Sequence, residues 1–151
     1  MVEKGELTDK SDDSDSPYKL SMTLPTATEF CALRNAAGLS PRKLHNVEIG
    51  LRHSIIGITI RKENQLVAIA RLIGDGGTAF EVVDVAVLPA EQGHGLGKLL
   101  MRAMTAYLTD HVPVEADVTL QADVPADQLY QQFGFRQTAP ASLGMIWHRP
   151  K

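Results

Sequence analysis

The sequence predicts a mixed α/β (α+β) fold, in which a central, mostly antiparallel, mixed sheet of six to seven strands carries helices on both faces. Three observations predict it. Short runs rich in β-branched residues alternate with segments whose apolar residues recur at helical spacing. A tight polar turn joins two of these runs, which is typical of an antiparallel hairpin. A later run passes through closely spaced glycines into an amphipathic segment, and this order indicates strand, turn and helix on one sheet.

The predicted strands have the clearest sequence patterns. Residues 62–64 form the polar turn of the hairpin, and Asp75-Gly76-Gly77 turns the chain into the strand after it. The strands are expected over residues 18–24, 55–60, 65–73, 79–87 and 118–122, with a last one near 144–147.

Two helices are predicted directly after the first strand. Thr26 or Thr28 can cap the first of them, and Gly38 closes it. Ser40 followed by Pro41 is typical of an N-cap with proline at the first helical position, so the second helix is expected to begin there. A long amphipathic helix over residues 96–110 and a short helix over residues 125–132 follow the later strands.

Size and composition fit one domain. The chain has 151 residues, 44% of them hydrophobic and 22% charged, as in an ordinary globular protein. No apolar run approaches the roughly 20 residues that cross a bilayer, so we expect no membrane association. Cys31 is the single cysteine, which excludes an internal disulfide and a cysteine-based metal site. The five histidines share no metal-ligand spacing, and we expect no metal.

The first 17 residues form an acidic tail. Six acidic residues stand there against two lysines, with almost no apolar residues, so residues 1–17 are expected to be disordered and residues 18–151 to form the domain. The tail lacks an apolar signal-peptide core and is too acidic for a mitochondrial transit peptide, so we expect a cytoplasmic protein, with the nucleus left open. No part of the chain has the basic bias of a nucleic-acid binder, and we expect no such partner.

The junction between the fourth strand and the long helix predicts an anion site. Gly93, Gly95 and Gly97 let the main chain approach a ligand closely, and the helix N-terminus offers free N–H groups and a favourable dipole. A Walker A loop fails because Gln92 stands where it needs glycine and Leu99 where it needs serine or threonine. The dinucleotide fingerprint fits poorly because its glycine spacing differs and a hairpin precedes the loop.

Two motifs in this order resemble the GNAT superfamily of acyl-CoA-dependent N-acyltransferases. The first motif is Gln92-x-x-Gly95-x-Gly97, directly after Val85-Ala86-Val87-x-Pro89. The second is Asp123-x-x-Ala126-x-x-Leu129-Tyr130-x-x-Phe133-Gly134-Phe135, in which Asp123 replaces the usual Asn. The resemblance covers residues 18–149 and implies a GNAT-like fold, with acetyl-CoA as cosubstrate and no metal.

The resemblance also implies which residues hold the cosubstrate. In the family the pyrophosphate of coenzyme A lies on the loop amides, and the backbone of the preceding strand pairs with the pantetheine arm. Unpaired edge groups would be available to this arm if the fourth and fifth strands diverge after Val87 and Leu120. The cofactor-binding residues expected here are Val85, Ala86, Val87, Gln92, Gly93, His94, Gly95, Leu96, Gly97, Lys98, Asp123 and Tyr130.

Acyl transfer from a thioester to an amine needs a base, an oxyanion donor and a proton for the thiolate. Tyr130 matches the general acid of the family, and a phenol with a pKa of about 10 stays protonated at pH 7. Glu81 is the first choice for the base and Asp84 the second, while a role for neither stays open. Strand alternation predicts Glu81 on the same face as Val83, Val85 and Val87, with Asp84 on the opposite face.

The acceptor expected from the resemblance is a primary amine of a small molecule, acetylated by direct transfer in a ternary complex. A protein or peptide N-acetyltransferase and a non-catalytic acyl-CoA-binding module are the alternatives, and a nucleotide-binding domain is a weaker one. Dimers are common in the family, which leaves a homodimer open. In the family the acceptor site is usually built from the first two helices, the turn near Asp75 and the last strand. The residues offered here are Arg34, Arg42, His45, Arg71 and Trp147.

Overall fold

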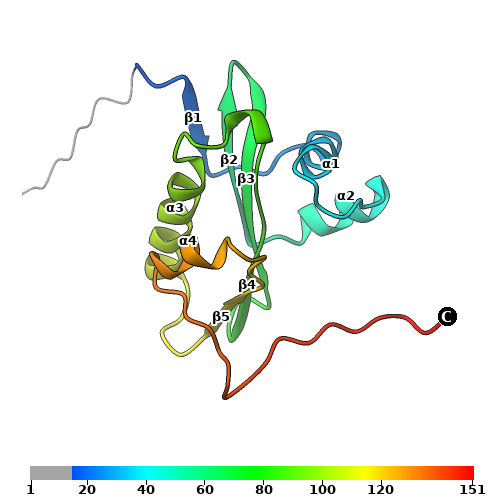
Figure 1. Cartoon of the computed structure of the whole chain (residues 1–151), viewed down its shortest axis with the longest axis vertical. Coiled ribbons are helices and arrows are strands. Elements are labelled where there is room, and N and C mark those ends of the chain that lie inside the picture. Colours follow the sequence, from blue (N-terminus) through cyan, green and yellow to red (C-terminus); the bar gives the residue numbers. More distant parts are fainter. Residues whose placement is uncertain (1–14) are drawn as a thin grey trace, which may run out of the picture.

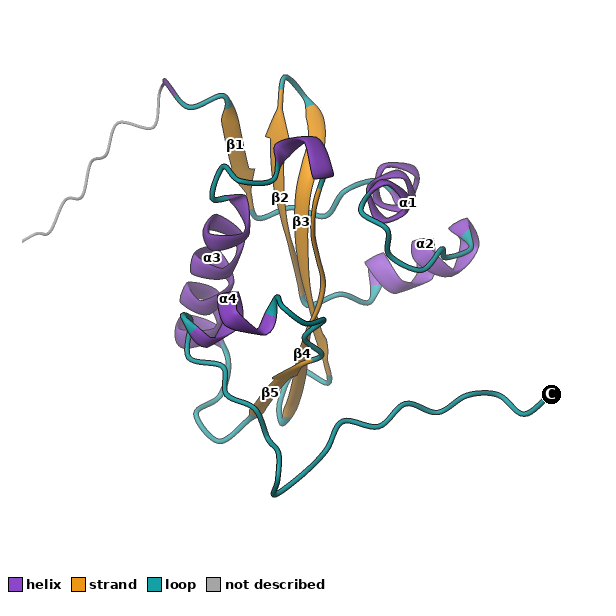
Figure 2. Ribbon diagram, in the orientation of Figure 1, coloured by secondary structure: helices purple, strands orange, loops and turns teal. Residues whose placement is uncertain are grey.

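The computed structural model describes residues 15–151, which form a five-stranded sheet with helices on both faces (Figures 1 and 2). The strands lie in the order of the chain: β1 (Tyr18–Ser21), β2 (Ile56–Lys62), β3 (Gln65–Gly74), β4 (Ala79–Val87) and β5 (Asp117–Leu120). All neighbours are antiparallel except β4 and β5, which are parallel. The acidic tail expected over residues 1–17 lies, up to residue 14, outside the described residues.

The helices divide between the two faces of the sheet (Figure 1). One face carries α1 (Ala27–Ala36) and α2 (Leu44–Arg52), and the other carries α3 (Leu96–His111) and the short α4 (Asp127–Gln131). A 3-10 helix, η2 (Pro89–Glu91), links β4 to the loop before α3. None of the helices within residues 15–151 is long and apolar enough to span a membrane.

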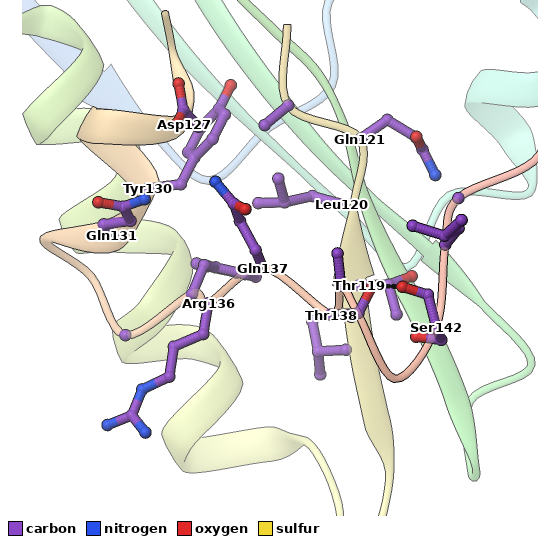
Figure 3. Close-up of a pocket in the computed structure, with 17 residues that line it drawn as sticks. Thr119, Leu120, Gln121, Asp127, Tyr130, Gln131, Arg136, Gln137, Thr138 and Ser142 are labelled. Carbon is purple, nitrogen blue, oxygen red and sulfur yellow. Dashed lines mark hydrogen bonds between the residues drawn. The ribbon is translucent and has the colours of Figure 1, made fainter. Parts of the chain in front are cut away.

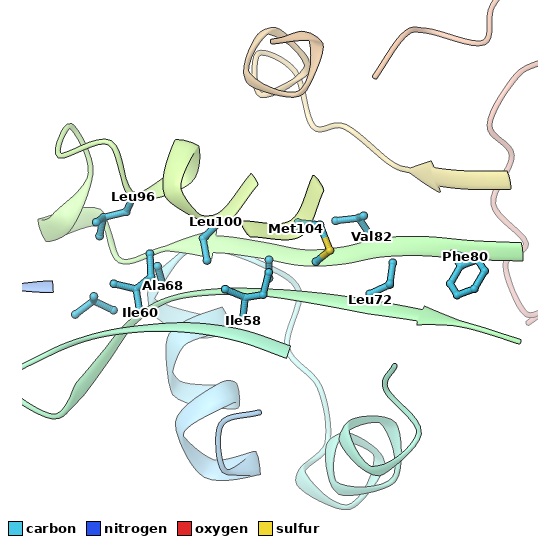
Figure 4. Packing of buried hydrophobic residues seen from close by; sticks show 11 residues of the cluster. Ile58, Ile60, Ala68, Leu72, Phe80, Val82, Leu96, Leu100 and Met104 are labelled. Atoms are coloured by element: carbon cyan, nitrogen blue, oxygen red, sulfur yellow. The ribbon is translucent and has the colours of Figure 1, made fainter. Parts of the chain in front are cut away.

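Both faces of the sheet are buried, because helices cover each of them. Consecutive residues of the central strands point to opposite sides and so enter two different clusters. The cluster beneath α3, shown in Figure 4, contains Ile58, Ile60, Ala68, Leu72, Phe80, Val82, Leu96, Leu100 and Met104. The cluster beneath α1 and α2 contains Phe30, Leu33, Val47, Leu51, Leu66, Ile69 and Ala86. The central strands are therefore enclosed on both faces.

The predicted start of α1 is confirmed, and the predicted start of α2 is wrong. The Thr26 hydroxyl accepts from the Glu29 amide at 3.2 Å, and the Glu29 carboxylate accepts from the Thr26 amide at 3.0 Å, which completes a capping box. The helix α2 begins at Leu44 rather than after Ser40. Ser40 is instead engaged by a buried arginine, because the Arg34 guanidinium donates to the Ser40 carbonyl at 2.9 Å.

Within residues 15–151 the sheet has five strands, so the expected count of six to seven is not matched there, and the strand expected near residues 144–147 does not form. After α4 the chain passes β5 without pairing with it and then runs away from the sheet (Figure 1). Met145, Ile146 and Trp147 are 94%, 79% and 70% exposed. Alternating apolar residues form a strand only where an edge pairs with them, and β5 is four residues long and pairs only with β4 in the described part of the chain.

Strand β4 contains a bulge at Asp84. The bulge reverses the predicted side of the sheet for the residues that follow it. Asp84 has a φ of +57°, and the register with β3 shifts so that two residues of β4 oppose Ala70. Val85 and Val87 therefore pack toward α3, on the same side as Val82. Glu81 alternates with its neighbour Val82 and lies on the α1/α2 face, so its expected placement beside Val85 is wrong.

The bulge also changes the relation between the two candidate bases. Asp84 bonds to Arg34 of α1 and to Arg71 of β3, so it too lies on the α1/α2 face. Glu81 and Asp84 thus share a face of the sheet, in contrast to the expected opposition. The alternation rule fails here because one residue in the left-handed region shifts the phase of every side chain after it.

Candidate cofactor and catalytic site

A cavity of about 370 Å³ lies where β4, the glycine loop and α4 meet. It is lined by Val85, Ala86, Val87, Gln92, Gly93, Gly95, Leu96, Gly97, Lys98, Ala126, Leu129 and Tyr130. The structure thus brings together all the residues expected to contact the cofactor except His94 and Asp123. His94 turns back to the Glu91 carbonyl, which lies 3.0 Å from its Nδ1.

The cavity runs along an edge of β4 that β5 does not cover. The parallel ladder ends at the pair Val82 and Leu120, whereas β4 continues to Val87. The two strands therefore separate earlier than the predicted divergence after Val87. Backbone groups on residues 83–87 that face this side have no strand beside them in the described structure, and such groups need partners. An extended ligand with amide groups can supply them.

The loop before α3 presents a row of backbone amides. Leu99 donates to the Gly95 carbonyl at 3.1 Å, and within residues 15–151 the amides of residues 93–98 donate to no backbone carbonyl. Gly93 and Gly95 have φ values of +83° and +77°, and a Cβ on either would meet no atom within 4 Å. The loop therefore combines a left-handed path that favours glycine with open space above it, at the positive end of a 16-residue helix.

Gly97 serves a different purpose. A Cβ at Gly97 would lie 3.0 Å from Cδ2 of Leu129 in α4, closer than side chains ordinarily pack. The missing side chain thus lets α4 approach the first turn of α3. Because α4 carries Tyr130, this contact helps to set the distance between the loop and the phenol.

Tyr130 lies between two cavities. It is 8% exposed and makes an edge contact with Phe135, with ring centroids 6.4 Å apart. Burial and the negative charge of Asp123 raise the pKa of its phenol above the ordinary value. The hydroxyl makes no hydrogen bond to any residue in 15–151. A buried, protonated phenol without a protein partner has the properties of a proton donor to a ligand.

The second cavity, of about 540 Å³, lies between β5, α4 and residues 134–144. Tyr130 lines this cavity as well as the first one, and Figure 3 shows it beside Asp127 on α4 with Leu120 of β5 nearby. The polar side chains that line this second cavity are mostly uncharged: Thr119, Gln121, Gln131, Gln137, Thr138 and Ser142.

Asp84 is the centre of a buried ion cluster. One carboxylate oxygen accepts from Arg34 and the other from Arg71 at 2.9 Å. The side chains of Asp84, Arg34 and Arg71 are 11%, 6% and 15% exposed. Arg34 and Arg71 were two of the candidates for an acceptor contact, and both are paired with Asp84 instead. Glu81 forms no ion pair with residues 15–151.

A carboxylate anchors the start of the loop, and no sequence pattern pointed to it. Glu91, the last residue of η2, accepts from the Tyr18 hydroxyl at 2.6 Å and from Lys62 at 3.2 Å. The position itself holds a signal, since an acid directly before an anion-binding loop opposes the ligand unless a cation or a strong donor neutralises it.

Comparisons with known proteins agree with this geometry. Residues 54–137 match the family model described as an acetyltransferase (GNAT) domain. The uncharacterized N-acetyltransferase ycf52 of Porphyra purpurea is 32% identical over 124 residues, which cover 80% of this chain and 70% of that protein.

Two solved structures have the same fold. SA2161 from meticillin-resistant Staphylococcus aureus, a probable acetyltransferase, superposes with a TM-score of 0.82 at 39% identity, covering 87% of this chain and 99% of that one. The GNAT family protein SP0256 of Streptococcus pneumoniae superposes with a TM-score of 0.72 at 25% identity, covering 89% and 99%. The resemblance seen in the two motifs is confirmed, and this chain belongs to the GNAT family of acetyltransferases.

Proposed function

We propose that this protein is an acetyl-CoA-dependent N-acetyltransferase that acetylates a primary amine of a small molecule. The observation that carries the proposal is the convergence on one cavity of three elements: the uncovered edge of β4, the free loop amides and the Tyr130 phenol. Each element suits one part of an acyl-CoA thioester. The edge of β4 suits the amide-bearing arm, the loop amides suit the pyrophosphate, and the phenol suits the departing sulfur.

The loop amides of residues 93–98 receive the pyrophosphate, and the α3 dipole favours its charge. Lys98 lines the same cavity and adds a positive charge in the first turn of α3. The pantetheine arm lies along residues 85–87, where its amides pair with the β4 backbone. This arrangement directs the thioester toward the gap between β4 and β5.

The transfer takes place in a ternary complex without a covalent enzyme intermediate. Glu81, directly or through a water molecule, removes a proton from the ammonium form of the acceptor, because an alkyl amine has a pKa of about 10.4. The amine nitrogen attacks the thioester carbonyl carbon, and a main-chain N–H near Val87 stabilises the oxyanion. The C–S bond then breaks, and Tyr130 donates its proton to the thiolate of coenzyme A. The amide nitrogen releases its second proton, which restores the phenol of Tyr130.

The environment of the two acids favours Glu81 as the base. Both oxygens of Asp84 accept from guanidinium groups, so its lone pairs are engaged. Glu81 is half-buried and has no such partner in the described residues. Since Glu81 lies on the α1/α2 face, the acceptor approaches from that face, opposite the α3 side that holds the pyrophosphate.

The test is turnover. Release of free thiol from acetyl-CoA is measured across a panel of small primary and aryl-linked amines, and binding of coenzyme A is measured separately by calorimetry. Turnover with a small amine, together with coenzyme A binding, supports the proposal. Tight binding without turnover on any acceptor would instead identify an acyl-CoA-binding module.

One relative justifies adding peptides to the panel. Histone acetyltransferase TAP1 of Glycine max is 29% identical over 128 residues, which span 54% of that protein. A protein or peptide amine is therefore the second candidate acceptor. Turnover confined to peptides would assign that class in place of a small molecule.

A further inference from the structure

We propose that Glu91 is a positioning residue that holds the pyrophosphate-binding loop against the sheet through Tyr18 and Lys62. The inference rests on the proposed function, since it takes residues 92–98 to be the site of the coenzyme A pyrophosphate. It adds a role for three residues that do not line the cofactor cavity.

The contacts of Glu91 join three elements. Its Oε2 accepts from the Tyr18 hydroxyl of β1 at 2.6 Å, and its Oε1 accepts from Lys62 Nζ of β2 at 3.2 Å. The ammonium of Lys62 also lies 5.7 Å from the centre of the Tyr18 ring. The Glu91 side chain is 14% exposed and that of Lys62 is 39% exposed, so these contacts form at the surface, at the edge of the sheet.

The same residue is connected to the middle of the loop. The Glu91 carbonyl lies 3.0 Å from Nδ1 of His94, and the His94 ring lies 5.9 Å from the Tyr18 ring. Glu91 therefore joins the loop to β1 and β2 through its side chain and to His94 through its main chain.

At its far end the loop is held by Leu96, which is 2% exposed in the cluster beneath α3. Between Glu91 and Leu96 it has few other contacts in the described structure: a Cβ at Gly93 or Gly95 would meet no atom within 4 Å, and the Gln92 amide reaches the Val87 carbonyl only at 3.4 Å. Glycine-rich segments lose much conformational entropy when they become ordered. A loop that is ordered before the ligand arrives spares that cost at binding, so the Glu91 contacts favour affinity.

The sign of the charge makes this role testable. A carboxylate beside a pyrophosphate site repels the ligand, so removal of its charge tightens binding if charge is all that matters. Hydrogen bonds from Tyr18 and Lys62 lower the pKa of Glu91, so it is ionised at neutral pH. An anchor predicts the opposite result, in which the neutral variant binds more weakly.

The chain supplies a matched control. Arg61 is the neighbour of Lys62 in β2 and pairs with Glu29 of α1 at 2.7 Å, on the other face of the sheet. The Glu29→Gln variant removes one carboxylate charge from a β2 ion pair, as Glu91→Gln does, but on α1, which covers the face of the sheet opposite α3. Tyr18→Phe removes a single hydroxyl and changes no charge at neutral pH.

The experiment measures the Kd for coenzyme A by calorimetry and the KM and kcat for acetyl-CoA and for acetyl-pantetheine, which lacks the pyrophosphate. For Glu91→Gln and Tyr18→Phe we expect the Kd and the KM for acetyl-CoA to rise about fivefold to tenfold. We expect kcat, and the KM for acetyl-pantetheine, to stay within about twofold of the wild type. The Glu29→Gln control is expected to bind coenzyme A like the wild type.

An unchanged or lower Kd for coenzyme A in both Glu91→Gln and Tyr18→Phe would overturn the anchor. An equal rise of the KM for acetyl-pantetheine would also overturn it, as would an equal rise of the Kd in the Glu29→Gln control. Each of these results leaves the proposed function standing, because the wild type still binds coenzyme A. Failure of the wild type to bind coenzyme A would overturn the proposed function and the anchor together.

Discussion

Replacement of Asp84 by asparagine tests the ion cluster at the β4 bulge. Asparagine has the same shape and tolerates the φ of +57° that Asp84 adopts, so the backbone is not newly strained. Its single oxygen can accept from one guanidinium, while its NH2 group faces the other. Arg34, which is 5% exposed, or Arg71 then keeps a buried charge without a counterion.

Loss of one partner from a buried ion pair costs about 3 to 5 kcal/mol. For a domain of this size each kcal/mol shifts Tm by roughly 2 to 4 °C, so we expect Asp84→Asn to lower Tm by about 10 °C. Thermal and urea unfolding followed by circular dichroism measure the loss. Asp117→Asn, at an exposed position of β5, is the control and is expected to change the stability by less than about 0.5 kcal/mol.

A fall in Tm of less than about 2 °C for Asp84→Asn would refute the reasoning, since the cluster would then contribute little beyond an exposed pair. The pH profile of the same variant separates structure from catalysis. With Glu81 as the base, the acidic limb of kcat/KM stays where the wild type has it. Loss of that limb in Asp84→Asn would assign the base to Asp84 instead.

Three further predictions follow from the site and from a second ion pair. Tyr130→Phe is expected to lower kcat by about 10² to 10⁴ while the Kd for acetyl-CoA changes less than about twofold; unchanged turnover would remove Tyr130 from the acid role. Gly95→Val is expected to abolish coenzyme A binding, because a branched residue neither adopts a φ of +77° nor leaves the loop open; calorimetry that shows retained affinity would contradict the loop assignment. Arg61 lowers the pKa of Glu29 to about 2, so this pair stabilises the fold above a pH of about 4.5 and loses its effect as the pH falls toward 2. We expect Glu29→Gln, whose wild-type carboxylate is 32% exposed, to cost about 1 kcal/mol at pH 7 and almost nothing near pH 2; a pH-independent cost in urea unfolding would assign the loss to other contacts.

Features that depend on a few neighbouring residues were predicted from the sequence. The Thr26 cap of α1 is a local motif, because its two hydrogen bonds close over three residues. The path of the glycine loop is also local, since positive φ at Gly93 and Gly95 is set by the residue type. The cofactor residues were expected from the two motifs that resemble the GNAT family, and most of them line one cavity.

Features that depend on distant partners were not predicted. Ser40 has the pattern of an N-cap, but Arg34 donates a hydrogen bond to the Ser40 carbonyl. The helix α2 begins at Leu44, with Lys43 at the N-cap position. The apolar pattern near residues 144–147 fits a strand, yet a strand also needs an edge beside it. The anchor at Glu91 joins residues 73 positions apart, and no local spacing indicates such a contact.

The bulge at Asp84 is held by residues distant in the sequence, Arg34 and Arg71, and it directly precedes the part of β4 that lines the cavity. The ladder to β5 ends at Val82, and the ladder to β3 is interrupted between Val83 and Ala86. Strand pairing thus leaves this stretch of β4 poorly held on both sides, where a ligand needs free backbone groups in fixed positions. A left-handed residue costs about 1 to 2 kcal/mol more than an ordinary strand conformation, and two guanidinium groups on one carboxylate offset that cost. The ion cluster therefore supplies the rigidity that the missing ladders do not. It does so from the α1/α2 face, which leaves the edge of β4 that lines the cavity free.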